Sequence, residues 1–394
     1  MKNEKIKYLI LWLLLVFVVF FLSSSNKSKE TSSPLILPLP SVTADVSATK
    51  APEITNLNED VKGAWISYIA LSETQFTEDS FKQKFSEYIT TAKANEITDL
   101  FVHTRPFCDA LYKSDIFPWS HLLSGTQGQD PLYDPLEFMI DLCHENGIRF
   151  HAWINPLRVK LKETPNELSS SSPYSEFVGE QSYYFFEKDE AIYINPAYKE
   201  MRTLISDGVV EIVKNYDVDG IHFDDYFYPA NMGDLDSSSY NLYTQTTANP
   251  LSVEKWRETN INTLIAQVYR EIKIVNEDVV FGISPQGNNN NNKALGANVE
   301  TWCNTKGYID YICPQIYFSY DNPSLSFEKC LNNWLSIPRL ESVKLYIGLA
   351  QYKVGTDADS GTWLNKGDII EKQKKESLEK TDGYILYEIR QMTK

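Results

Sequence analysis

Short apolar runs alternate with longer amphipathic runs from residue 61 onward. The apolar runs predict buried β-strands, because each is continuous, is of strand length and ends in polar or turn-forming residues. There are eight of them, at 61–69, 99–106, 148–156, 218–226, 279–285, 309–318, 343–352 and 383–389. Helical patterns fill the intervals, at 81–92, 134–147, 195–215, 252–275, 299–306, 326–336 and 367–380. The second helix has the clearest limits, since Asp134 suits an N-cap, Pro135 a first turn and Gly147 a C-terminus.

Strands that alternate with helices form parallel sheets, and eight such units close as a (β/α)8 barrel. The alternative is an open doubly wound sheet, which usually has a glycine-rich phosphate loop after its first strand. Residues 66–75, at the end of the first apolar run and just beyond it, contain no glycine. We therefore predict an α/β protein with a TIM barrel. Few residues follow the run at 383–389, so we expect that a regular final helix is missing or that another segment covers that wall.

The first 60 residues have a different pattern. A basic segment precedes residues 8–22, which carry no charge. This stretch is shorter than the about 20 residues of a usual membrane span and is typical of a secretory signal. No A-x-A cleavage motif follows, so cleavage and retention both stay open. We predict a signal peptide or membrane anchor at 1–22, a flexible Ser/Thr/Pro-rich linker at 23–60 and an extracytoplasmic catalytic domain at 61–394.

The composition narrows the possible partners. The 53 acidic and 37 basic residues give a net charge of −16, which argues against binding nucleic acid. The 24 Tyr and 8 Trp suit stacking on sugar rings, although a large core would use them too. The five cysteines form no CxxC pair, so the sequence predicts neither a zinc site nor a disulfide framework, while one disulfide stays open. We predict no cofactor and no metal.

Polar and aromatic residues collect at the carboxyl ends of the predicted strands, which is where barrel enzymes have their active sites. The sharpest case is 218–226, where alternation places His222, Asp224 and Tyr226 on one face. Asp224 should therefore point over the barrel mouth, with Asp225 beside it. Two adjacent carboxyl groups shift each other's pKa, as acid–base chemistry requires.

Each candidate also has a structural interpretation. Asp224 and Asp225 would otherwise cap a loop or bind a cation, and His151 and His222 would be hydrogen-bonded wall residues. Arg105 and Arg158 would form salt bridges, Asn155-Pro156 would be a turn, and Tyr317 and Tyr352 would pack at the rim. The five asparagines at 288–292 are predicted to be a mobile loop tip without a role.

At these residues the sequence resembles the bacterial glycosyl-hydrolase-like family 10. Residues 103–159 (HTRPFCDALYKSDIFPWSHLLSGTQGQDPLYDPLEFMIDLCHENGIRFHAWINPLRV) and 215–229 (NYDVDGIHFDDYFYP) carry the resemblance, and SPQG, IDYICPQIYF and LAQYKVG continue it. It covers about residues 61–385. It implies a (β/α)8 barrel and glycosidase activity on bacterial glycans, with cell-wall peptidoglycan strands as the expected substrate. Cys108 stands where the family commonly has Gly, and Gln286 replaces a usual aromatic.

We predict a glycoside hydrolase whose partner is a polysaccharide, with membrane contact through the N-terminal segment if it is retained. Asp224 is the expected nucleophile or base, and the acid is expected to be Asp225, Asp109 or Glu388. The predicted substrate-binding residues are Arg105, His151, Asn155, Arg158, His222, Tyr226, Gln315, Tyr317, Tyr352 and Lys353, and Trp119 and Trp153 are further stacking candidates. The alternatives are a non-catalytic surface glycan-binding barrel and a metal-dependent polysaccharide deacetylase.

Overall fold

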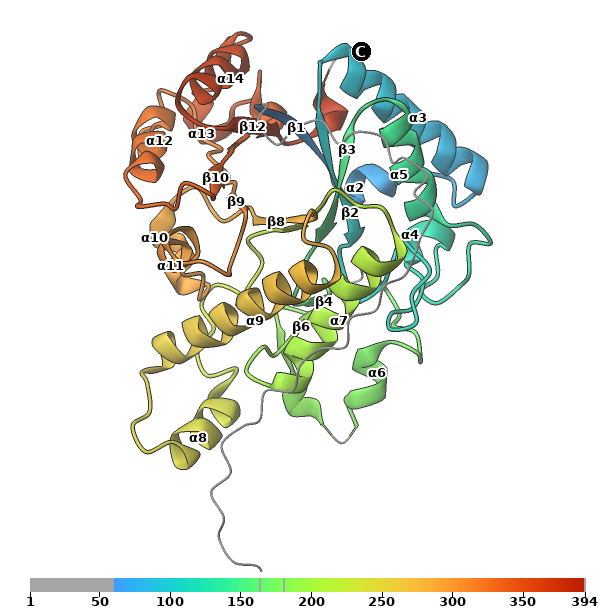
Figure 1. Cartoon of the computed structure of the whole chain (residues 1–394), viewed down its shortest axis with the longest axis vertical. Helices are drawn as coiled ribbons and strands as arrows, with labels where there is room; N and C mark the ends of the chain where they lie inside the picture. Colours follow the sequence, from blue (N-terminus) through green and yellow to red (C-terminus); the bar gives the residue numbers. More distant parts are fainter. Residues whose placement is uncertain (1–59, 163, 180, 393–394) are drawn as a thin grey trace, which may run out of the picture. The chain divides into compact units, whose positions relative to one another are not determined.

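The computed structural model describes residues 60–162, 164–179 and 181–392, and its centre is a closed parallel sheet (Figure 1). The strands are β1 (Val61–Ile66), β2 (Asp99–Arg105), β3 (Arg149–Ile154), β7 (Gly220–Phe223), β8 (Val280–Ile283), β9 (Tyr311–Ile312), β10 (Lys344–Leu345), β11 (Ile347–Leu349) and β12 (Gly383–Leu386). Their order is β10-β9-β8-β7-β3-β2-β1-β12-β11. Only Tyr346 separates β10 from β11, so the two are consecutive pieces of one strand. That strand joins β9 to β12 and closes the predicted eight-stranded barrel.

Helices surround the sheet, as Figure 1 shows. The longer ones are α3 (Glu78–Ala94), α5 (Pro135–Glu145), α7 (Lys199–Asn215), α9 (Val253–Val275), α12 (Phe327–Leu335) and α14 (Ile369–Lys380). The shorter ones are α2 (Tyr68–Leu71), α4 (His121–Ser124), α8 (Ser237–Thr246), α10 (Asn289–Ala294), α11 (Val299–Asn304) and α13 (Ala358–Gly361). The Asp134 side chain accepts hydrogen bonds from the N–H groups of Leu136 and Glu137, which confirms the predicted N-cap.

The wall after β12 has no regular helix among the residues that the structure describes, as the sequence led us to expect. The chain instead forms a 3₁₀ turn at Ile389–Gln391 (η3), which contacts α3 and β1. Ile389 is buried there and covers the strand in place of a helix.

The connection between β3 and α7 contains a small antiparallel sheet that the sequence analysis missed. It consists of β4 (Arg158–Lys160), β6 (Ala191–Ile194) and β5 (Phe185–Lys188), in that order, with α6 (Pro173–Phe177) and the 3₁₀ turn η1 (Ser182–Tyr184). Helix α7 consequently begins at Lys199 and not at residue 195. Strands of three or four residues carry too little alternation for a pattern to predict them.

Aromatic side chains fill the inside of the barrel. Trp65, Phe101, Trp153 and Tyr311 form a cluster there that is separate from the larger core between strands and helices. Gly282 makes room for it, because a Cβ at that position would lie 2.2 Å from the Tyr311 ring. The barrel is therefore packed through its length, and only its mouth is left for a ligand.

An ion-pair cluster occupies the opposite end, at the start of β2. Asp99 is 1% exposed and accepts hydrogen bonds from Arg149 Nε at 2.7 Å, Arg149 Nη2 at 2.8 Å and His151 Nε2 at 2.9 Å. These donors hold the pKa of Asp99 below its usual range against the effect of burial. His151 also stacks on Phe101, with ring centroids 4.2 Å apart. His151 thus belongs to the foot of the barrel, which corrects the prediction that it binds substrate.

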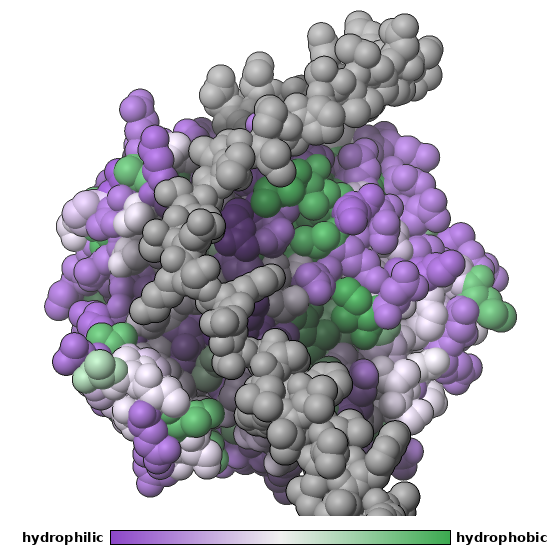
Figure 2. Space-filling view, turned by 60° about the horizontal axis from the view of Figure 1, so that its bottom comes forward, coloured by the Kyte–Doolittle hydropathy of each residue, from purple (hydrophilic) through white to green (hydrophobic). Residues whose placement is uncertain are grey.

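On the face seen in Figure 2 the described residues are mostly hydrophilic, with small apolar patches separated by polar side chains. All five cysteines are buried and unpaired, so the disulfide that the sequence left open is not formed. No helix in the described ranges is long and apolar enough to cross a membrane. The predicted signal or anchor and most of the predicted linker lie outside the described residues.

Candidate active site

A pocket of about 360 Å³ lies at the carboxyl ends of the strands. Aromatic, acidic and amide side chains from different strands and connections line it: Trp65, Tyr68, Ile69, His103, Trp153, Arg158, Leu161, Asp224, Asp225, Tyr226, Ser284, Gln315, Tyr317, Tyr352 and Tyr387. Asp224 and Asp225 are the only acidic residues in this lining. The mouth of the barrel therefore brings two carboxyl groups together with a largely aromatic surface.

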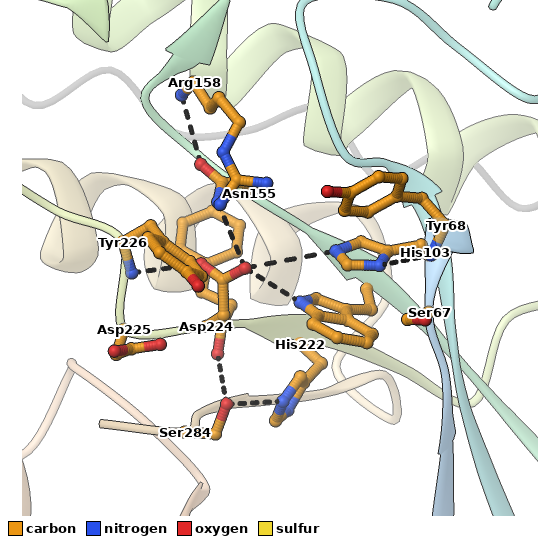
Figure 3. A network of polar contacts seen from close by, with 12 residues as sticks. Ser67, Tyr68, His103, Asn155, Arg158, His222, Asp224, Asp225, Tyr226 and Ser284 are labelled. Atoms are coloured by element: carbon orange, nitrogen blue, oxygen red, sulfur yellow. Dashed lines mark hydrogen bonds and ion pairs between the residues drawn. The ribbon is translucent and has the colours of Figure 1, made fainter. Parts of the chain in front are cut away.

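Asp224 is held from several directions by N–H donors (Figure 3). Its Oδ2 accepts from Trp153 Nε1 at 3.2 Å and from Asn155 Nδ2 at 3.1 Å, and its Oδ1 accepts from the Tyr226 N–H at 3.2 Å. Burial raises the pKa of Asp224 to about 7, while Arg158 and the donors act in the opposite direction. The carboxyl is thus fixed in orientation and changes its charge near neutral pH.

His103 is a site residue to which the sequence analysis gave no role. Its Nδ1 accepts from the Tyr68 N–H at 3.0 Å, so in the neutral ring the proton is on Nε2, which lies 4.0 Å from Asp224 Oδ2. Burial keeps the pKa of His103 well below its usual value, consistent with that neutral form. Strand alternation from Phe101 would have indicated this inward position.

Asp225 lies half-buried at the end of β7, and its Oδ1 accepts from Gln315 Nε2 at 2.9 Å. The same amide nitrogen donates to the Ser284 carbonyl at 2.9 Å, which fixes the Gln315 side chain. Burial raises the pKa of Asp225, and the Gln315 donor opposes this. Asp224 and Asp225 therefore both hold protons more strongly than ordinary surface carboxyls.

Arg158 is the only Lys or Arg in the pocket lining. It lies on β4, in the small antiparallel sheet between β3 and α7, which we call the inserted sheet. Its guanidinium lies over the Tyr226 ring at 4.2 Å from the centroid. No carboxylate among the described residues pairs with it within 4.0 Å, and its Nε has no hydrogen-bond partner there. The Arg158 charge is therefore available to a ligand in the pocket.

Three tyrosines in the pocket lining contact one another. Tyr317 lies 5.9 Å from Tyr352 and 5.9 Å from Tyr387 between ring centroids, and Tyr352 is 39% exposed. Such rings present flat, partly exposed faces of the kind that pack against sugars. Lys353 has a different role, because its Nζ donates to the Tyr317 carbonyl at 2.9 Å and pairs with Asp359 at 3.1 Å. It does not line the pocket, contrary to its prediction as a substrate-binding residue.

A family model described as Glycosyl hydrolase-like 10 matches residues 60–364. The chain belongs to this family. The sequence is 29% identical over 389 residues to the glycosyl hydrolase DigH of Escherichia coli O6:H1, covering 89% of this chain and 88% of that protein. It is 34% identical over 296 residues to the glycosyl hydrolase YngK of Bacillus subtilis, covering 71% of this chain and 57% of YngK. The chain thus spans somewhat more than half of YngK.

Two solved structures show that this family member shares its fold with glycosidases. The PgaB (BpsB) glycoside hydrolase domain of Bordetella bronchiseptica has a TM-score of 0.54 at 11% identity, over 84% of this chain and 94% of that one. The catalytic domain of β-amylase from Paenibacillus polymyxa also has a TM-score of 0.54, at 10% identity and with the same coverages. At such identities the likeness shows the barrel fold alone, which agrees with the expected architecture.

His222, matched by the family resemblance, lies beneath the pocket and not in it. It has 0% exposure, and its Nε2 accepts from Trp65 Nε1 at 3.1 Å, so its Nδ1 donates to the Tyr311 hydroxyl at 2.9 Å. Burial lowers the pKa of His222 well below its usual value. His222 is therefore a neutral wall residue, which corrects its predicted contact with substrate.

Arg105 and Asp109 are also away from the pocket of this family member. The pairing of β2 with β3 shifts between His103 and Arg105, and Arg105 lies over the Phe117 ring at 4.6 Å. This irregularity turns Arg105 away from the mouth, although Arg105 lies at the end of the strand as predicted. Asp109 has 0% exposure and accepts from Gln127 Nε2 at 3.0 Å and pairs with His121 at 3.1 Å. The sequence analysis predicted that Arg105 binds substrate and that Asp109 could be the acid. Because both side chains are buried away from the pocket, neither contacts a ligand there.

Two other candidates are likewise excluded from the pocket lining. Glu388 is 1% exposed, accepts from the Ser67 N–H at 3.3 Å and pairs with Arg390. Trp119 is packed against the main core. Of the three acids that the sequence left open, Asp225 is the one that the structure places in the pocket beside Asp224.

No group of three or more His, Cys, Asp or Glu side chains is arranged to hold a metal ion within the part of the chain that the structure describes. His222 and His151 make hydrogen bonds to other residues, and neither lines the pocket with the two aspartates. The polar groups at the mouth thus form a carboxyl pair with one cation and several amides.

Proposed function

We propose that this family member hydrolyses glycosidic bonds in a bacterial polysaccharide, with Asp224 and Asp225 as its two catalytic carboxyl groups. The observation that carries the proposal is the pocket itself, whose lining contains these two acidic residues and no other. Most glycosidases use two carboxyl groups, one as acid and one as nucleophile or base. Raised pKa values at both groups support acid–base roles near neutral pH.

The surroundings of the two groups suggest different roles. Asp224 accepts hydrogen bonds from three N–H donors, which favours its ionised form once the proton has left, and this suits the nucleophile or base. Asp225 is half-buried and adjoins the pocket, so it can donate a proton to a leaving oxygen and recover one from solvent. We assign Asp225 as the acid.

Cell-wall peptidoglycan strands are the proposed substrate. The family membership supports a glycan, and the three tyrosines of the pocket lining support a chain of sugar rings. Arg158 supports sugars with acidic substituents, because its charge has no carboxylate partner among the residues that the structure describes. We also propose that the protein acts outside the cytoplasm, secreted or held at the membrane by residues 1–22, as the apolar run at 8–22 suggests.

The test is incubation of the protein with purified peptidoglycan, intact or stripped of its peptides, followed by measurement of new reducing ends. Release that needs Asp224 and survives EDTA is the expected result. Binding without release would favour the non-catalytic glycan-binding barrel. Release that EDTA abolishes would favour a metal-dependent reaction.

Replacement of Arg158 with Gln should lower kcat/KM on an acidic glycan by about 10- to 100-fold, since a hydrogen bond to a charged group is lost. The same glycan with its carboxyl groups reduced to alcohols should be cleaved equally by both proteins. Lys160→Gln is the matched control, because Lys160 is on the same strand but does not line the pocket. An equal loss on acidic and reduced glycans would show that Arg158 does not read substrate charge.

The pH dependence follows from the raised pKa of Asp224. An ordinary aspartate is ionised at pH 5.5 and at pH 7.5, whereas a group with a pKa of about 7 gains most of its charge between them. We therefore expect kcat/KM to rise between pH 5.5 and 7.5 as Asp224 loses its proton. A profile already flat from pH 5 upward would contradict the assignment of Asp224.

A further inference from the structure

His103 is the only histidine in the pocket lining, and neighbouring groups hold its ring in place (Figure 3). The ring stacks on Trp153, with ring centroids 3.3 Å apart. The Tyr68 ring lies edge-on to it, with centroids 5.6 Å apart. Because the residue is only 2% exposed, its ring has little freedom to turn. The fold therefore sets the direction of both ring nitrogens before a ligand binds.

The proton of the neutral His103 ring is on Nε2, the nitrogen that faces Asp224. Nδ1 accepts from the Tyr68 N–H at 3.0 Å and cannot donate at the same time. Nε2 is buried and has no hydrogen-bond partner among the residues that the structure describes. Its distance of 4.0 Å to Asp224 Oδ2 is too long for a hydrogen bond. The Nε2–H is thus a buried donor without an acceptor, an unfavourable arrangement that a ligand oxygen would correct.

The separation of these two atoms fits one bridging oxygen. Two hydrogen bonds of about 2.9 Å that meet at roughly a right angle span 4.0 Å. Both residues line the pocket, so a ligand reaches this place. An oxygen there has to accept from His103 and donate to the Asp224 carboxylate, and a hydroxyl group does both. An ether oxygen only accepts, and an acetamido N–H only donates.

We propose that His103 is a substrate-binding residue: its Nε2–H donates to a free hydroxyl of the sugar at the bond to be cleaved, and that hydroxyl donates to Asp224. The inference rests on the proposed function for its ligand, a sugar placed at Asp224. Burial keeps the pKa of His103 well below its usual value, so the ring remains a neutral donor. A sugar with an ester at this hydroxyl cannot form both bonds and is selected against.

Two replacements of His103 separate the functions of its two ring nitrogens. In His103→Asn the amide oxygen can accept from the Tyr68 N–H in place of Nδ1, but no group replaces the Nε2–H. In His103→Gln the longer amide brings an N–H to the place of Nε2, while the acceptor for Tyr68 is lost. On peptide-free glycan strands we expect kcat/KM to fall by about 10-fold in His103→Asn, the effect of one hydrogen bond, and by less than about threefold in His103→Gln.

His144→Asn is the matched control, since His144 on α5 pairs with Asp219 and does not line the pocket. It should leave kcat/KM unchanged. The opposite order, with His103→Gln impaired and His103→Asn at the wild-type rate, would overturn the inference and leave only a structural contact with Tyr68. Equal losses in the two His103 variants would overturn it as well. In both cases the proposed function would stand.

A binding measurement covers the case in which the wild type does not cleave the strands. Dissociation constants of the same variants for the same glycan strands, from calorimetry, then replace kcat/KM. Weaker binding by His103→Asn than by His103→Gln and wild type would support the hydroxyl contact and refute the proposed hydrolysis. Equal affinity in His103→Asn and wild type would overturn the inference. A wild type that neither binds nor cleaves the strands would overturn both proposals.

Discussion

Replacement of Asp224 with Asn is expected to lower the rate of glycan hydrolysis by about 10²–10⁴-fold, the range that a positioned acid or base contributes. The substitution keeps the size of the side chain but removes the charge that the reaction needs. Three N–H donors surround the carboxyl, and an amide can accept from them only through its single oxygen. Reducing-end release at saturating substrate measures the loss.

The control for this experiment lies at the other end of the same strand. Asp217 precedes β7, and its side chain is 94% exposed, so Asp217→Asn changes the same charge far from the pocket. It should hydrolyse glycans at the wild-type rate. Full activity in Asp224→Asn, with an unchanged melting temperature, would remove Asp224 from the mechanism.

Replacement of Asp99 with Ala should lower the free energy of unfolding by about 3–5 kcal/mol, the usual cost of removing one partner of a buried ion pair. Arg149 and His151 would then lose their shared carboxylate at the foot of the barrel. Urea unfolding at pH 7 measures the change. Asp217→Ala, on the surface, should cost at most about 1 kcal/mol.

The ion pairs of Asp99 also predict how the free energy of unfolding changes with pH. Because the pKa of Asp99 in the folded protein lies below its usual value, its contribution to stability is complete above the unfolded pKa and is lost as the pH falls toward the folded one. The difference in the free energy of unfolding between wild type and Asp99→Ala should therefore decrease below about pH 4. A gap that stays constant down to pH 2 would show that Asp99 stabilises the fold by packing alone.

The barrel was predictable because each of its strands is buried on both faces and therefore appears as a continuous apolar run. The direction of the Asp224 side chain was also predictable, because side chains alternate between the two faces of a strand. Alternation does not give the height of a side chain along the barrel axis, so His151 and His222 were assigned to the mouth although both lie below it. Arg105 was misplaced because a local shift in strand pairing leaves no mark in the sequence pattern.

Loops were the other source of error. Asp109 and Lys353 follow strand ends, as catalytic residues often do, but each is held by polar partners of its own. The asparagine run has the composition of a loop, and only its contacts show a helix that holds Gln286. The contacts of these residues depend on which side chains lie close together in the folded protein. The spacing of hydrophobic and polar residues along the sequence does not give that information.

The inserted sheet has an evolutionary consequence. Arg158, the cation of the pocket, comes from β4, whereas Asp224 and Asp225 stand at the end of β7 in the barrel itself. The connection that contains β4, β5 and β6 could therefore be exchanged or re-mutated without disturbing the strand that bears the carboxyl pair. Selection on this one connection would change the proposed preference for charged or neutral sugars, while the two carboxyl groups that we propose as catalytic stay the same.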